Sequence, residues 1–427
     1  SASLNKYAAI PQGIDCERCH GPGEVHVKRK LTGEVIDTSK YIDYSIVNPA
    51  KLSPDLQFDV CQRCHLQGTS VLVEDKDFDD FKPGISLTEI MDVYLPKYKD
   101  DESFIMASHV DRLKESSCYN NSTMTCITCH NPHKSVTTLD VNYFDNKCQK
   151  CHLECRDEQV EDCSSCHMPK SSSIDIMHVT ITDHKIGLHH KKLKEKGGFL
   201  GLFAINNENP TNLSKAKAYL KRYESFESNL VYLDSALYYL KKSADNYTSY
   251  IQYYYLRKDD NSLINFVLNN KLDTIKYKKQ NLAITYSRIG EVLARNEMTH
   301  IAQKYLESAV HLMPLVIDYQ IKYGAFLIQQ KDTELASMIL NKALLLNPTV
   351  KEVHLNLGYL DIINRDYISA KNRLQQSILL DPDYILAFEN LVLLAQLQNK
   401  DVEVKLYLNK ILEIDPHHDK ARKILEL

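Results

Sequence analysis

The chain has 427 residues, of which 43% are hydrophobic and 25% are charged, and its formal net charge is −4. This balance is typical of a globular protein and gives no electrostatic reason to expect a nucleic-acid partner. No apolar run reaches the roughly 18 to 20 residues that a membrane-spanning helix needs, so we expect no transmembrane segment.

Five copies of one cysteine and histidine motif occur within the first 167 residues. In each copy, two cysteines lie three positions apart and a histidine directly follows the second cysteine. The copies are Cys16/Cys19/His20, Cys61/Cys64/His65, Cys126/Cys129/His130, Cys148/Cys151/His152 and Cys163/Cys166/His167. This pattern is typical of covalent haem attachment.

The spacing has a chemical reason. Two thiols three positions apart can form thioethers with the two vinyl groups of one porphyrin, and the next residue can ligate its iron. Structural zinc and redox-active dithiols are the alternatives, but neither needs a histidine after every second cysteine. We therefore predict five haem c groups. Their proximal iron ligands are His20, His65, His130, His152 and His167.

Residues 1–186 form the predicted pentahaem cytochrome c domain. The stretch shows no sustained helical or strand period and holds few apolar residues for its length. Five large flat haem rings can supply the buried apolar surface that side chains do not. We expect this region not to fold without haem.

Further histidines supply candidates for the second axial ligand of each iron. They are His26, His109, His133, His178 and His184, with His189 and His190 just beyond. Five candidates for five irons predict bis-histidine ligation throughout. Because His26 and His133 follow their own motifs so closely, we expect each to ligate a neighbouring iron.

Two cysteines, Cys118 and Cys155, remain outside the motifs. Haem attachment of this kind takes place outside the cytoplasm, in the periplasm or at the cell surface, where disulfides also persist. We expect either a Cys118–Cys155 disulfide or two unpaired thiols. The sequence begins at Ser1 without a leader, so we expect that a signal peptide has been removed or that a longer precursor precedes it.

Several local sequences carry a family resemblance: Cys19-His20-Gly21-Pro22-Gly23 with His26, Thr125 to His133 with Ser117-Cys118 ahead of it, Cys166-His167-Met168-Pro169, and Thr182-Asp183-His184. Over residues 12–186 the chain resembles multihaem cytochromes related to the ammonia-oxidiser tetrahaem cytochrome and the pentahaem cytochrome c nitrite reductases. Its order resembles bacterial proteins in which such a module precedes tetratricopeptide repeats. The resemblance implies closely stacked haems that pass electrons along the stack. The nitrite reductases bind their active haem through a lysine, whereas all five motifs here end in histidine.

The rest of the chain is predicted to be helical. Basic residues, paired glycines and an Asn-Pro indicate a linker over residues 187–212, and residues 213–282 read as degenerate helical repeats. Pro314, Pro348, Pro382 and Pro416 recur every 34 residues, the period of tetratricopeptide repeats. Small residues share this register at Gly290, Gly324 and Gly358 and at Ala302, Ala336 and Ala370. We predict four repeats over residues 283–416 and a capping helix over residues 417–427.

The predicted fold is therefore mainly α, with an irregular multihaem module followed by an α-solenoid. We expect electron transfer through five haems, with the repeats docking a redox protein or a multi-subunit assembly. The alternative is a reductase or oxidase of small nitrogen or sulfur compounds with one open iron. The repeats could instead be a spacer or dimerisation surface, or the haems a sensory module attached to them. No nucleophile and base pair or phosphate-binding loop stands out in the helical half.

Overall fold

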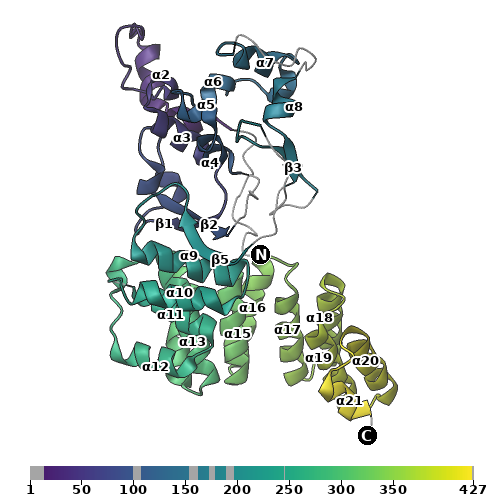
Figure 1. Ribbon diagram of the computed structural model, residues 1–427. Helices are drawn as coiled ribbons and strands as arrows, with labels where there is room; N and C mark the ends of the chain where they lie inside the picture. Colours follow the sequence, from purple (N-terminus) through teal and green to yellow (C-terminus); the bar gives the residue numbers. More distant parts are fainter. Residues whose placement is uncertain are drawn as a thin grey trace. The chain divides into compact units, whose positions relative to one another are not determined.

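The structure is a computed structural model that describes residues 14–99, 107–152, 162–172, 178–188, 197–244 and 246–425. Cys155, His189 and His190 lie outside these residues. The chain forms two compact units that divide between Asn246 and Tyr247. Figure 1 shows both units, and each is described here by itself.

The haem-motif part of the first unit consists of short helices joined by turns. Gly21-Pro22-Gly23 separates the first two helices, because Pro and Gly interrupt helical hydrogen bonding. The helices are α1 (Glu17–His20), α2 (Glu24–Leu31), α3 (Pro54–Gln62), α4 (His109–Lys114), α5 (Ser117–Asn120), α6 (Cys126–Cys129), α7 (Tyr143–Cys148) and α8 (Cys163–His167). Single 3₁₀ turns lie at Pro49–Lys51, Phe78–Asp80, Leu87–Glu89 and Val136–Thr138.

Two small antiparallel sheets complete this region. Strands β1 (Thr69–Leu72), β2 (Met91–Tyr98) and β5 (Phe199–Ala204) form one sheet in the order β1-β2-β5. In its register, Tyr94 lies opposite Thr69 on one side and Ala204 on the other. Strands β3 (Lys170–Ser172) and β4 (Thr180–Thr182) form the second sheet.

The apolar cores around the haem motifs are small. One cluster contains Val60, Phe81, Leu87, Ile90, Met91 and Val93, and another contains Phe58, Val110 and Leu113. Many other apolar side chains are largely exposed, namely Val25, Val27, Leu31, Val35, Tyr41, Ile42 and Tyr44. Burial of apolar surface is the main favourable contribution to folding, and these exposed side chains add little to it.

The structure differs from the predicted linker and from the start of the predicted repeats. Strand β5 lies inside residues 187–212 and pairs with β2, because Phe199-Leu200-Gly201-Leu202-Phe203 is an apolar run of strand length. Helices α9 (Asn212–Ser225) and α10 (Leu230–Leu240) belong to the first unit. The Tyr94 hydroxyl donates to Ser214 Oγ over 2.9 Å, which fixes α9 against β2.

The second unit is a stack of helix pairs (Figure 1). The pairs are α11 (Tyr247–Arg257) with α12 (Asp260–Asn269), α13 (Lys279–Arg295) with α14 (Thr299–Leu312), α15 (Ile317–Gln329) with α16 (Thr333–Leu346), α17 (Lys351–Ile363) with α18 (Tyr367–Leu380) and α19 (Ile385–Leu397) with α20 (Asp401–Ile414). A last helix, α21 (Asp419–Leu425), packs on α20. Thr274–Lys276 is a 3₁₀ turn between α12 and α13.

The 34-residue period is visible in the backbone as well as in the sequence. Glu297, Lys331, Arg365 and Asn399 each adopt a left-handed conformation, with φ between 56° and 64°, in the turn inside a helix pair. These four residues lie 34 positions apart, so each pair turns in the same way. The protein is mainly α and the second unit is an α-solenoid, which confirms the predicted fold class.

Two glycines allow the close approach of paired helices. A Cβ at Gly290 would lie 2.7 Å from Leu306 Cγ, and a Cβ at Gly324 would lie 2.7 Å from Leu340 Cγ. At Gly358 the corresponding distance to Leu374 is 3.0 Å. The small-residue register of the sequence therefore has a steric cause.

We predict that Gly324→Ala destabilises the solenoid by about 1 to 2 kcal/mol, because overpacking outweighs the better helix propensity of alanine. Urea unfolding followed by far-ultraviolet circular dichroism measures this change. Gly358→Ala is the matched comparison and should cost less, since its neighbour is farther away. Equal or higher stability of Gly324→Ala contradicts the steric explanation.

Candidate haem-binding centre

All five motifs adopt one turn of helix. The backbone N–H of the motif histidine donates to the carbonyl of the first cysteine, over 2.9 Å at His20, His65 and His130 and 3.0 Å at His152. The fifth motif lies wholly within α8. Because residues three positions apart share one face of a helix, this turn places both thiols of a motif on the same side.

The motifs lie next to one another in chain order. The Cys61 thiol donates a hydrogen bond to Cys126, and this bond and burial raise the pKa of Cys61, so the second and third motifs are in contact. Burial and the neighbouring Cys61 and Cys64 raise the pKa of Cys19. Burial, Cys163 and Cys129 raise the pKa of Cys148 to about 11. Each motif therefore has the next one as its electrostatic neighbour.

The fourth motif is less enclosed than the third. Helix α7 ends at Cys148, so Cys151 lies in the turn beyond it, where its thiol is exposed, whereas Cys148 is half-buried. Cys151 is nevertheless close to the third motif: burial raises the pKa of Cys129, and Cys118 and Cys151 add to this rise. Burial therefore does not support the predicted haem attachment at Cys151. This attachment stays a prediction that depends on the motif spacing and on the helical turn.

Three motif histidines face histidines from elsewhere in the chain. The ring centroids of His20 and His133 lie 6.1 Å apart with an angle of 14° between the rings. The rings of His130 and His184 lie 6.3 Å apart at 26°, and those of His65 and His109 lie 5.4 Å apart at 82°. With metal–nitrogen distances of about 2 Å, imidazoles on opposite sides of one metal ion have centroids about 6 Å apart. The His20–His133 and His130–His184 pairs therefore fit one iron between their rings, whereas the rings of His65 and His109 lie closer together and edge-on.

Hydrogen bonds at Nδ1 leave Nε2 free to ligate. His20 Nδ1 lies 2.8 Å from the Val47 carbonyl and His184 Nδ1 lies 3.0 Å from the Thr182 carbonyl. A carbonyl only accepts, so Nδ1 carries the hydrogen and donates in both cases. His26 Nδ1 lies 3.0 Å from Ser45 Oγ. This arrangement is typical of metal-ligating histidines, whose second nitrogen is held by an oxygen.

The clustered histidines are neutral. Burial and the neighbouring His184 lower the pKa of His109 to about 4. Burial also lowers the pKa of His130 and of His184. The neutral imidazole is the form that binds a metal.

The structure does not bring all predicted ligands together. Among the described residues, no histidine ring lies against His152 or His167, the histidines of the last two motifs. His178 is exposed and has a left-handed backbone, with φ of 63°. Cys118 is a free thiol, and its predicted partner Cys155 is outside the described residues, so the disulfide stays a prediction.

A buried ion pair that the sequence reasoning missed links two of the facing segments. Arg112 donates to Asp183 through Nε over 2.9 Å and through Nη2 over 2.5 Å. Arg112 lies three residues after His109, and Asp183 directly precedes His184. The pair therefore positions both histidines, whose rings lie 4.6 Å apart. The only sequence signal was the acidic residue beside His184.

The described residues contain no group of three or more His, Cys, Asp or Glu side chains arranged to hold a metal ion. A haem iron takes two axial side chains, so such a group is not what the facing histidines would form. Within the same part of the chain, no helix is long and apolar enough to cross a membrane.

The sequence comparison and the structure comparison find different kinds of relatives, each over part of the chain. A scan against protein-family models finds no match. Among curated proteins the chain is similar to the multiheme cytochrome MtrA of Shewanella baltica, with 28% identity over 156 residues. This match covers 34% of the chain and 44% of MtrA, so it spans less than half of that protein.

Among solved structures, one similar chain is residues 41 to the end of MamA from Desulfovibrio magneticus, with 17% identity and a TM-score of 0.35. That match covers 41% of this chain and 98% of the other. YrrB, a tetratricopeptide-repeat protein with an unusual peptide-binding site, matches with 19% identity and a TM-score of 0.31, over 50% of this chain and 100% of its own. The chain thus combines a partial sequence similarity to a multihaem cytochrome with an α-solenoid.

We predict that Asp183→Asn lowers the free energy of unfolding of the first unit by about 3 kcal/mol, because it removes the buried carboxylate that pairs with the Arg112 charge and leaves the half-exposed Glu115 carboxylate as an ionic partner. Denaturant unfolding, monitored through the haem absorption, measures this change in the free energy of unfolding. Asp79→Asn is the control, since Asp79 forms its ion pairs with Arg18 and Arg63 at a side chain that is 91% exposed. Similar losses in both variants contradict a positioning role for Asp183.

Proposed function

We propose that the protein is a pentahaem c-type cytochrome that transfers electrons, and that its solenoid docks a redox protein or a larger assembly. The observation that carries the proposal is the facing of motif histidines by histidines from distant segments, at separations suited to one iron between them. Two further features support it: the motif cysteines are adjacent in chain order, and much apolar surface around them is uncovered.

The proposed ligands follow from these contacts. The cysteine pairs of the five motifs form the thioethers, and the motif histidines are the proximal ligands. His133 is the distal ligand opposite His20, His109 opposite His65 and His184 opposite His130. His26 and His178 complete the proposed set of five distal ligands for iron. Haem c, when bound, supplies an iron that gains or loses one electron.

The chain's own residues hold the ligands in place. The carbonyls of Val47 and Thr182 orient His20 and His184, and Arg112 with Asp183 joins the segments of His109 and His184. The short distances between successive motifs support an array in which neighbouring haems exchange electrons. We place the protein outside the cytoplasm, because haem c is attached there. We also propose that residues 12–186 are related to the ammonia-oxidiser tetrahaem cytochrome and the pentahaem cytochrome c nitrite reductases, which their motifs resemble.

We predict that His133→Ala converts one of the five irons from low-spin to high-spin, because it removes the ring facing His20. Electron paramagnetic resonance of the oxidised holoprotein measures the spin state, and intact mass gives five haems per chain. His311→Ala is the control, since His311 is an exposed side chain on α14. An unchanged spectrum in His133→Ala contradicts this ligand assignment, and an intact mass without haem contradicts the proposed function.

A further inference from the structure

One junction of the solenoid departs from the regular repeat. Successive helix pairs are joined by four residues, at 313–316, 347–350 and 381–384. The connection between α12 and α13 instead runs over nine residues, 270–278, and includes a 3₁₀ turn. The longer connection opens space between helices that pack closely elsewhere.

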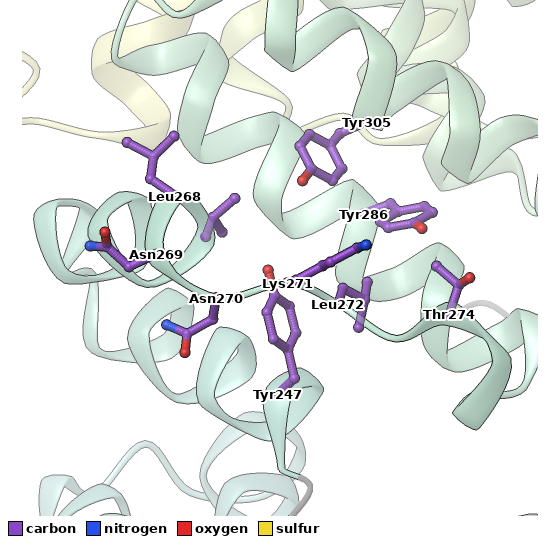
Figure 2. Close-up of a pocket in the computed structure, with 10 residues that line it drawn as sticks. Tyr247, Leu268, Asn269, Asn270, Lys271, Leu272, Thr274, Tyr286 and Tyr305 are labelled. Atoms are coloured by element: carbon purple, nitrogen blue, oxygen red, sulfur yellow. The ribbon is translucent and has the colours of Figure 1, made fainter.

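A pocket of about 510 Å³ occupies this junction. Tyr247 from α11, Tyr286 from α13 and Tyr305 from α14 line it together with residues 267–272 and Thr274. Figure 2 shows the hydroxyls of Tyr247 and Tyr305 turned toward the middle of the pocket and the Lys271 side chain extended toward Tyr286. Its volume lies in the range of ordinary ligand sites.

Hydrogen-bond donors converge on this space. Burial raises the pKa of Tyr247, Tyr286 and Tyr305, so all three phenols are protonated donors at neutral pH. None of the three hydroxyls has a hydrogen-bond partner among the described residues. Lys271 adds a positive charge, and no lining residue is acidic. The pocket therefore offers hydroxyl donors and a positive charge without a negative charge of its own, and a carboxylate is the group that accepts several such bonds.

Aromatic rings form part of the walls. The rings of Tyr286 and Tyr305 lie 5.4 Å apart in an edge-on arrangement, and Tyr247 packs 5.0 Å from Phe266. Val267, Leu268 and Leu272 add apolar surface beside the donors. Such a lining suits a charged group carried on a peptide backbone better than a free inorganic anion, because the apolar part also gains contacts.

We propose that the pocket formed by Tyr247, Lys271, Tyr286 and Tyr305, here called the tyrosine pocket, binds the side-chain carboxylate of an Asp or Glu in an extended segment of a partner protein. This inference rests on the proposed function in that it names the chemistry of the docked partner. The proposed interaction site lies at the junction of α12 and α13, where the connection is longer than those between the later helix pairs.

The test uses the holoprotein and three short peptides. The chain contains no tryptophan, so the fluorescence of a tryptophan-bearing peptide reports binding directly. Acetyl-Gly-Trp-Glu-Gly-amide carries one side-chain carboxylate and acetyl-Gly-Trp-Gln-Gly-amide carries none. Acetyl-Gly-Trp-Gln-Gly with a free terminus carries only the terminal carboxylate. We expect the glutamate peptide to bind about tenfold more tightly than either glutamine peptide.

Variants locate the site. Lys271→Glu should abolish the preference for the glutamate peptide, and Tyr305→Phe, which keeps the ring, should weaken it. Lys342→Glu makes the same charge change at an exposed position of α16 and should leave binding unchanged. Circular dichroism of each variant confirms that the solenoid is folded.

Four results overturn the inference: equal affinity for the glutamate and glutamine amides, preference for the free terminus, no binding of any peptide at millimolar concentration, or unchanged selectivity in Lys271→Glu. Haem content is read from the absorption of the same samples. Lost selectivity with five haems present contradicts the pocket assignment alone, whereas absence of haem contradicts the proposed function.

Discussion

The requirement of each proposed haem iron for a second axial ligand ties together parts of the chain that are far apart in sequence. His20 and His133 are separated by more than a hundred residues, yet their rings face each other. The segments that carry these histidines bury few apolar side chains, so packing alone gives them little stability. Under the proposed ligand assignment, their arrangement depends on ligation and on the ion pair between Arg112 and Asp183. Binding of the cofactor and folding of this region are expected to be one process.

The solenoid was largely predictable because its determinants are local and repeated. A proline closes each unit and a small residue lets its two helices approach, and both recur every 34 residues. The left-handed turn residues Glu297, Lys331, Arg365 and Asn399 follow the same period, although nothing in their side chains marks them. Strand β5 was not predicted, because lysines and glycines obscured a short apolar run whose partner, β2, lies a hundred residues earlier.

In the haem-motif region, the sequence predicted which cysteines and histidines form the motifs and left the pairing of the histidines open. The helical turn at Cys126, Cys129 and His130, closed by the hydrogen bond from His130 N–H to the Cys126 carbonyl, is seen only in the structure. Which distal histidine faces which motif depends on contacts between distant segments. The Arg112–Asp183 pair joins residues 71 positions apart, and a single sequence does not reveal such a contact. The two units thus differ in predictability because one is built from neighbours in sequence and the other from distant residues.

Electron paramagnetic resonance of the oxidised holoprotein, with and without added nitrite, tests the central claim most directly. If five bis-histidine haems form the electron-transfer array, every iron is low-spin and nitrite leaves the spectrum unchanged. A high-spin signal that responds to nitrite contradicts this account, because one iron would then be open to a substrate and the protein would be an enzyme.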